Sequence, residues 1–178
     1  MRNLILEKLD SCDDLLQYFT STAVTFAAVD NSLSATGIAT GWVAGDRVVI
    51  AGSSAGGNNT TMTIKTVATG KLTMYDTVSD DNAGETITVT QEWPGSFKEV
   101  NGFSTLTGVI NCSGNAVIYI DQSANGVDID YTSSWSVTGG TALSYEVAVL
   151  LPYAKMRIRT NAADQTSMRA YMYGRKIS

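Results

Sequence analysis

The chain has 178 residues and a formal net charge of −5, so it is long enough to bury a core without disulfides or metals, and it is too acidic for a typical nucleic-acid-binding domain. It lacks histidine, the commonest general base and metal ligand, and it has neither a leader-like start nor an apolar run long enough to span a membrane. These features argue against most enzymes, nucleic acid partners and membrane insertion, and they predict no cofactor and no metal.

Residues 1–22 differ from the rest of the chain, because apolar and acidic residues are interleaved there without a regular period. Ile5, Leu9, Leu16 and Phe19 would share one face of a helix that packs on its own domain. The alternative is an extended arm that docks on a neighbouring subunit, since chain ends become ordered mainly when they are held by a contact. The sequence therefore predicts an N-terminal helical or extended arm.

Residues 23–93 alternate between apolar and polar positions in short segments separated by glycine-rich turns. Segments 61–65, 71–75 and 86–90 each present one apolar face and one face of threonine, lysine or tyrosine. Short, evenly spaced strands of this kind predict a small antiparallel β-barrel or β-sandwich. Pro94 cannot donate to a strand ladder, so we expect a domain boundary directly before it.

Residues 94–178 contain six further strand-like segments with hairpin spacing, which predicts a second antiparallel β-sandwich. The expected strands are 97–110, 116–121, 127–136, 142–150, 153–160 and 166–173. The whole chain is thus predicted to be all-β. Cys12 and Cys112 have no metal-binding or redox spacing, and we expect both to be buried free thiols.

Basic residues are concentrated at the end of the sequence. Residues 155–178 carry a charge of +5 and residues 1–154 a charge of −10, which would favour attraction between subunits, although a charged solvent face is an equal alternative. If the last two strands pair, their outer faces form one basic and aromatic patch that fits a contact between subunits. The residues of this predicted interface are Lys155, Arg157, Arg159, Arg169, Tyr171, Tyr173 and Arg175.

Other candidate sites have simpler interpretations. Residues 121–128 mimic the first half of a calcium loop, but Asn125 and Gly126 are better explained as the tip of a β-hairpin. Asp80, Asp81 and Glu85 are interpreted as a solvated turn rather than a cation site or a carboxylate pair. The sequence contains no nucleophile motif, so it predicts no catalytic residues.

Two stretches resemble bacteriophage virion proteins. Residues 45–50 (GDRVVI), 52–53, 58–59 and 83–89 (AGETITV) look like a small β module that recurs in phage structural proteins. A second stretch is similar to β-sandwich domains of head decoration, cement and head-fibre proteins; it runs through 117–123 (VIYIDQS), 152–158 (PYAKMRI), Asn161, 165–166 and Tyr171. The resemblance implies self-association, commonly as trimers, and attachment to a capsid or tail.

We therefore expect a non-enzymatic phage structural protein located in the virion. The leading hypothesis is a capsid decoration or cement protein, whose partners are copies of itself and the major capsid protein or another virion protein. The alternative is a tail or fibre adhesin, in which Trp42, Trp93 and Trp135 line a shallow glycan site, although burial in the core explains these tryptophans more simply. A hydrolase that acts through carboxylates alone is a more remote alternative.

Overall fold

The computed structural model describes residues 4–161 and 165–177, which form fifteen strands and one short 3₁₀ turn. The predicted all-β class is confirmed, and the sheets are antiparallel and not closed, consistent with a β-sandwich. In chain order the elements are β1 (Leu4–Cys12), β2 (Tyr18–Ser21), β3 (Thr25–Ala27), β4 (Ser32–Ser34), β5 (Arg47–Ala51), η1 (Gly56–Asn58), β6 (Thr61–Ala68), β7 (Lys71–Met74), β8 (Ile87–Trp93), β9 (Lys98–Glu99), β10 (Thr105–Cys112), β11 (Ala116–Ser123), β12 (Tyr131–Val137), β13 (Leu143–Ala148), β14 (Tyr153–Thr160) and β15 (Met168–Ile177).

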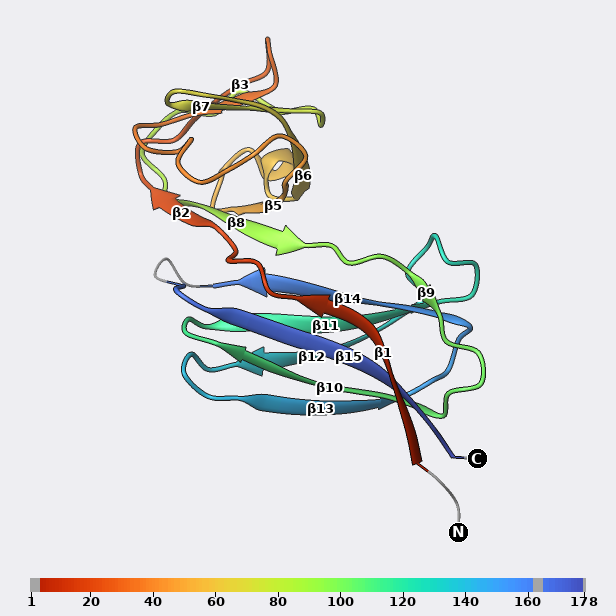
Figure 1. Cartoon of the computed structure of the whole chain (residues 1–178). Coiled ribbons are helices and arrows are strands. Elements are labelled where there is room, and N and C mark those ends of the chain that lie inside the picture. Colours follow the sequence, from red (N-terminus) through yellow and green to blue (C-terminus); the bar gives the residue numbers. More distant parts are fainter. Residues whose placement is uncertain (1–3, 162–164, 178) are drawn as a thin grey trace. The chain divides into compact units, whose positions relative to one another are not determined.

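The chain divides into two compact units (Figure 1). The smaller unit is the continuous segment Gln17–Glu92, and the larger one combines Met1–Leu16 with Trp93–Ser178. The division after Glu92 lies one residue before the boundary expected at Pro94. The division after Leu16 means that the first strand belongs to the larger unit. The smaller unit follows this strand in the sequence, as an insertion into the larger unit.

The larger unit consists of two antiparallel layers. One layer has the strand order β1-β15-β10-β13, and the other has β12-β11-β14, with the short β9 paired to β14. Apolar side chains that alternate along the strands of both layers form a single core between them, as expected of a sandwich. The buried core residues are Cys12, Leu16, Val100, Leu106, Ile110, Cys112, Ala116, Ile118, Ile120, Val137, Tyr145, Ala154, Met156, Ile158, Met168, Ala170 and Met172.

The smaller unit has its own core and the strand order β2-β8-β5-β6-β7-β4-β3, with every pairing antiparallel. The alternation predicted around residues 61–65 and 71–75 is confirmed, because Met62, Ile64, Leu72 and Met74 are buried. The buried core residues of this unit are Val24, Phe26, Leu33, Ile38, Trp42, Val48, Ile50, Met62, Ile64, Leu72, Met74, Val78, Ile87 and Val89.

The helix proposed for residues 1–22 is wrong in the described part of that segment. Residues 4–12 form β1, which runs antiparallel beside β15, the red and blue strands that lie together in Figure 1. The register reaches from Leu4 opposite Ile177 to Cys12 opposite Ala170, with a bulge between Lys8 and Asp10. The pairing supplies the backbone hydrogen bonds that a helix would otherwise make internally.

Both cysteines are buried free thiols in the core of the larger unit, as predicted. Cys12 ends β1, and Cys112 ends β10. Burial raises the pKa of the Cys12 thiol to about 12, so this group stays protonated at neutral pH. Burial also raises the pKa of the Cys112 thiol.

Candidate interaction surface

In each of the last two strands, taken by itself, the residues predicted to face outward do so. On β14 the side chains of Ala154, Met156, Ile158 and Thr160 are buried, and the intervening basic residues are partly exposed. On β15 the side chains of Met168, Ala170 and Met172 are buried, and the residues between them face outward. The outward residues are Lys155, Arg157 and Arg159 on β14, and Arg169, Tyr171, Tyr173 and Arg175 on β15.

The condition for one continuous patch is not met, because β14 and β15 do not pair with each other. Within the larger unit β14 pairs with β11 and β9, whereas β15 pairs with β1 and β10. The two strands therefore belong to different layers of the sandwich, and their side chains share the core between the layers. Their outward residues lie on opposite faces of the larger unit, so the seven predicted interface residues make two separate surfaces.

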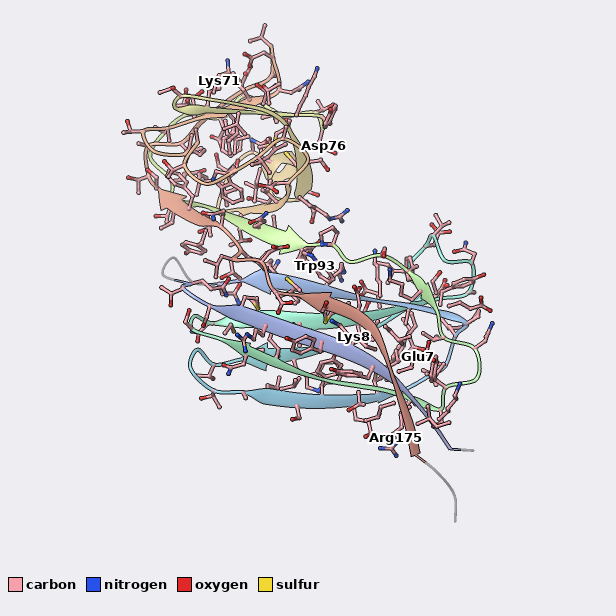
Figure 2. All side chains as sticks on the ribbon, in the orientation of Figure 1. Glu7, Lys8, Lys71, Asp76, Trp93 and Arg175 are labelled. Atoms are coloured by element: carbon pink, nitrogen blue, oxygen red, sulfur yellow. The ribbon has the colours of Figure 1, made fainter. Side chains whose placement is uncertain are left out.

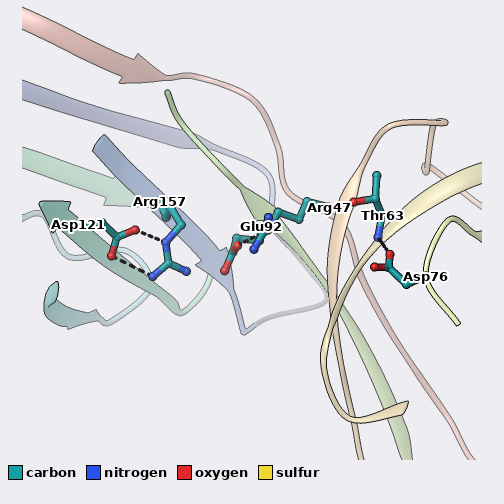
Figure 3. A network of polar contacts seen from close by, with 6 residues as sticks. All are labelled: Arg47, Thr63, Asp76, Glu92, Asp121 and Arg157. Atoms are coloured by element: carbon teal, nitrogen blue, oxygen red, sulfur yellow. Dashed lines mark hydrogen bonds and ion pairs between the residues drawn. The ribbon is translucent and has the colours of Figure 1, made fainter. Parts of the chain in front are cut away.

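The β14 face is organised by Asp121, a fully buried carboxylate on β11. Figure 3 shows the Arg157 guanidinium against this carboxylate, with Nε donating to Oδ2 and Nη2 donating to Oδ1 at 3.0 Å. The hydroxyl of Thr132 also donates to Oδ1 at 2.8 Å, and the Arg157 guanidinium lies 4.6 Å from the centre of the Tyr119 ring. Arg157 thus compensates a buried charge within its own subunit, and a substitution there would disturb the sheet before it disturbed any contact.

The β15 face carries the other group of outward residues. The rings of Tyr171 and Tyr173 are 6.4 Å apart, and the ammonium of Lys8 on β1 lies 5.2 Å from the centre of the Tyr171 ring. Arg175 forms an ion pair with Glu146 of β13 at 3.0 Å, and Figure 2 shows its side chain beyond Glu7 and Lys8 along the same sheet. Arg169 is the exposed cation of β15, since the other outward residues of this strand are only partly exposed.

Some of the opposite charges from the basic and acidic regions of the chain pair with each other within one subunit. The basic residues Arg157 and Arg175 come from residues 155–178, and their acidic partners Asp121 and Glu146 come from the acidic remainder. Attraction between the two regions therefore already operates within the fold. An equivalent attraction between subunits depends on the charges that remain at the surface, among which Arg169 is prominent.

The calcium-like segment is a loop held by its own side chains. Asn125 Oδ1 accepts hydrogen bonds from the backbone of Val127 and Asp128, and Asp130 Oδ2 accepts one from the backbone of Ala124. The strand expected from residue 127 begins only at Tyr131, so residues 124–130 form a loop rather than a two-residue turn at Asn125 and Gly126. Within the described ranges, no group of three or more histidine, cysteine, aspartate or glutamate side chains is arranged to hold a metal ion.

The acidic turn of the smaller unit fastens a glycine-rich loop. Asp81 accepts hydrogen bonds from the hydroxyls of Ser53 and Ser54, and Glu85 accepts one from the Ser54 backbone at 2.5 Å. The Ser53 hydroxyl lowers the pKa of the Asp81 carboxyl by stabilising its charged form. Buried Asn58 joins the same network, because its Nδ2 donates to the Ser53 hydroxyl at 3.2 Å and also to the backbone carbonyl of Ser79 at 2.9 Å. These hydrogen bonds stabilise the loops of the smaller unit. The bond from the Thr63 N–H to the Asp76 carboxylate, shown in Figure 3, has the same role.

The three tryptophans do not meet in a glycan site. Trp42 is buried in the core of the smaller unit, whereas Trp93 and Trp135 pack against the core of the larger unit. Two adjoining depressions of the smaller unit, about 370 and 490 Å³, share a lining at Gly37, Thr69 and Gly70. Their other lining residues are alanine, serine, threonine and Val67, so they provide neither an aromatic platform for a sugar nor a charged group.

The sequence analysis missed a group of exposed apolar residues in the larger unit. Val127, Ile129 and Leu150 are 76%, 46% and 59% exposed. The buried side chain of Gln122 holds both loops, because its Oε1 accepts the Leu150 N–H at 2.7 Å and its backbone carbonyl accepts the Asp130 N–H at 3.0 Å. The sequence predicts a strand over residues 127–136, in which Val127 and Ile129 alternate with Asp128 and Asp130, so it gives no sign that this segment is an exposed loop.

Comparison with known proteins adds no identification. No protein-family model matches the sequence, and no curated protein matches it either. In the described part of the chain there is no helix with the length and apolar character needed to cross a bilayer. A function must therefore be inferred from the residues and their geometry.

Proposed function

We propose that the chain is a non-enzymatic structural protein of a bacteriophage particle, acting as a decoration or cement protein of the head. It attaches to the major capsid protein or another virion protein and associates with copies of itself. The resemblance of residues 45–89 and 117–171 to phage β modules supports this role. The expected trimer stays a prediction.

The observation that carries the proposal is the exposure of Val127, Ile129 and Leu150, an apolar surface on two loops that are both hydrogen-bonded to Gln122. Large apolar side chains at the surface mark contact sites when they are grouped rather than scattered. These three stand on loops fixed by Gln122 and Asn125, so docking would order little additional backbone. Apolar side chains held on fixed loops at the surface are suited to a permanent protein contact rather than to turnover of a substrate.

The test replaces Val127 and Leu150 together by aspartate and compares particles produced with each form of the protein. Burial of one such side chain contributes about 1.5–3 kcal/mol, so we expect the number of bound copies to fall about tenfold or more at limiting protein concentration. Val29→Asp is the matched control, because Val29 is 94% exposed in the smaller unit and stands outside this surface.

Copies per purified particle are counted by quantitative mass spectrometry. The proposal is overturned if the double variant is retained at the wild-type number, or if wild-type particles contain no copies. Hydrolysis of a capsular polysaccharide by the purified chain would refute the non-enzymatic part separately.

A further inference from the structure

The edge strands of the described sheets differ in how they are protected against pairing with another chain. A free edge presents unpaired backbone N–H and C=O groups, and proteins usually block it with charges, bulges or short strands. β1 carries Glu7, Lys8 and Asp10 and a bulge between the last two. β13 carries Glu146 near its middle, and β2, β3 and β9 have only four, three and two residues.

β12 has none of these protections. Its seven residues, Tyr131–Val137, include no charged residue and no proline, and its register with β11 is continuous from Gln122 opposite Tyr131 to Ala116 opposite Val137. Its outward side chains, Thr132, Ser134 and Ser136, are small and exposed. Among the edges that the structure describes, β12 is therefore the long and uncharged one without a bulge.

We propose that β12 pairs antiparallel with β12 of a second copy of the chain, about a twofold axis at Ser134. This register is the one that uses all seven residues of both strands, and it places core-side residues opposite core-side residues. Tyr131 then lies opposite Val137, Thr132 opposite Ser136, and Ser134 opposite itself. Aromatic with β-branched pairs and hydroxyl pairs are favourable across antiparallel strands, and no like charges meet.

The choice of a second copy as the occupant follows from this self-complementarity. Twofold contacts are the commonest in homo-oligomers, and a twofold contact requires a strand that matches itself when reversed. The contact goes beyond the proposed attachment to a particle, because it concerns the free protein. It links copies in pairs, whether each copy is a single chain or belongs to a trimer.

The first experiment is disulfide trapping with the full chain carrying Ser134→Cys. In the proposed register the two introduced thiols face each other at the separation of a directly opposite strand pair, so oxidation should give a covalent dimer on a non-reducing gel. Ser144→Cys is the matched control, since Ser144 is exposed on the outward side of the other long edge, β13. The native Cys12 and Cys112 are buried and should contribute no background.

The second experiment exchanges charge at the same position. Ser134→Lys and Ser134→Glu each place like charges opposite one another and should halve the mass measured by sedimentation at concentrations where the wild type is paired. An equimolar mixture of the two variants should recover the paired mass. The corresponding variants of Ser144 should leave the mass unchanged.

The proposal is overturned if the wild type keeps an odd number of copies at high concentration and Ser134→Cys forms no crosslink. It is also overturned if both cysteine variants crosslink equally, or if pairing survives both charged variants. Particle binding is measured separately with the Val127 and Leu150 variant, so a failure of the β12 contact is distinguishable from a failure of the proposed function.

Discussion

Asp121 is a fully buried carboxylate on the outer side of β11, where it accepts hydrogen bonds from Arg157 and Thr132. Removing its charge leaves the guanidinium of Arg157, a side chain that is only 16% exposed, without this counterion. We expect Asp121→Asn to lower the free energy of unfolding by about 3 kcal/mol, the range found when one partner of a buried pair is lost. Urea unfolding followed by circular dichroism measures the change.

The control for Asp121 is Glu146→Gln, which removes the acid from the surface pair with Arg175. That pair is 34% and 50% exposed, so its loss should cost no more than about 1 kcal/mol. Equal losses for the two variants would show that burial does not distinguish the two pairs. A stable Asp121→Asn variant would contradict the structural role assigned to Arg157.

The exposure of single residues was largely predictable, whereas their roles were not. Alternation along residues 153–160 correctly separated the buried Met156 and Ile158 from the outward Arg157. The same pattern carried no sign that Arg157 would find Asp121, 36 positions earlier, because alternation reports a face and not a partner. Two of the seven predicted interface residues, Arg157 and Arg175, thus proved to form ion pairs within the subunit.

At the scale of elements, β10 depends on a glycine where three strands meet. Gly108 lies opposite Met172 of β15 and Tyr145 of β13, and the Tyr145 hydroxyl donates to the Tyr171 carbonyl at 2.8 Å. A Cβ added at Gly108 would overlap both the Tyr171 carbonyl oxygen and the Tyr145 hydroxyl. The close packing of these strands therefore requires a residue without a side chain.

We expect Gly108→Ala to destabilise the larger unit by about 1–3 kcal/mol, because the added methyl group forces neighbouring atoms apart. The measurement is the urea concentration at which half of the protein is unfolded, followed by a spectroscopic signal from the core of the larger unit. Gly56→Ala should be close to neutral, since a Cβ there meets no atom within 4 Å and the residue is outside the left-handed region. A Gly108→Ala variant as stable as the wild type would mean that Tyr145 moves aside without cost.

The positions of strands were more predictable than their pairings. Residues 153–160 were expected as a strand and form β14 with those limits. The N-terminal segment was ambiguous because the spacing of Ile5 and Leu9, four residues, suits a helical turn and also two steps of a strand. A single basic patch depended on β15 pairing with β14, but β15 lies between β1 and β10, an arrangement set by packing across the whole sandwich.

At the scale of the whole molecule, the reactivity of both cysteines measures the unfolding of the larger unit. Cys12 precedes the smaller unit in sequence and Cys112 follows it, yet both lie in the larger core. We expect neither thiol to react with a disulfide reagent at pH 8 in the native protein, and two per chain to react after unfolding. The raised pKa of Cys12, about 12, keeps the native rate low because the reactive thiolate is scarce.

Thiol titration in increasing urea measures this exposure. Rapid modification of one or both cysteines without denaturant would contradict their place in the core. The tryptophans offer a complementary signal, since Trp42 belongs to the smaller unit and Trp93 and Trp135 pack in the larger one. In a Trp42→Phe variant the remaining tryptophan fluorescence comes from Trp93 and Trp135, so it should follow the unfolding of the larger unit. The fluorescence change and the exposure of the thiols should then occur at the same urea concentration.

The insertion of Gln17–Glu92 behind the first strand has a consequence for synthesis on the ribosome. The smaller unit is continuous, so it has all its strands as soon as Glu92 has emerged. β1 is made before it but must wait for β15, with which Glu7 and Cys12 eventually align opposite Gly174 and Ala170. A prematurely terminated product would consequently lack an interior strand of the larger sandwich, and its exposed core would mark it for proteases and chaperones.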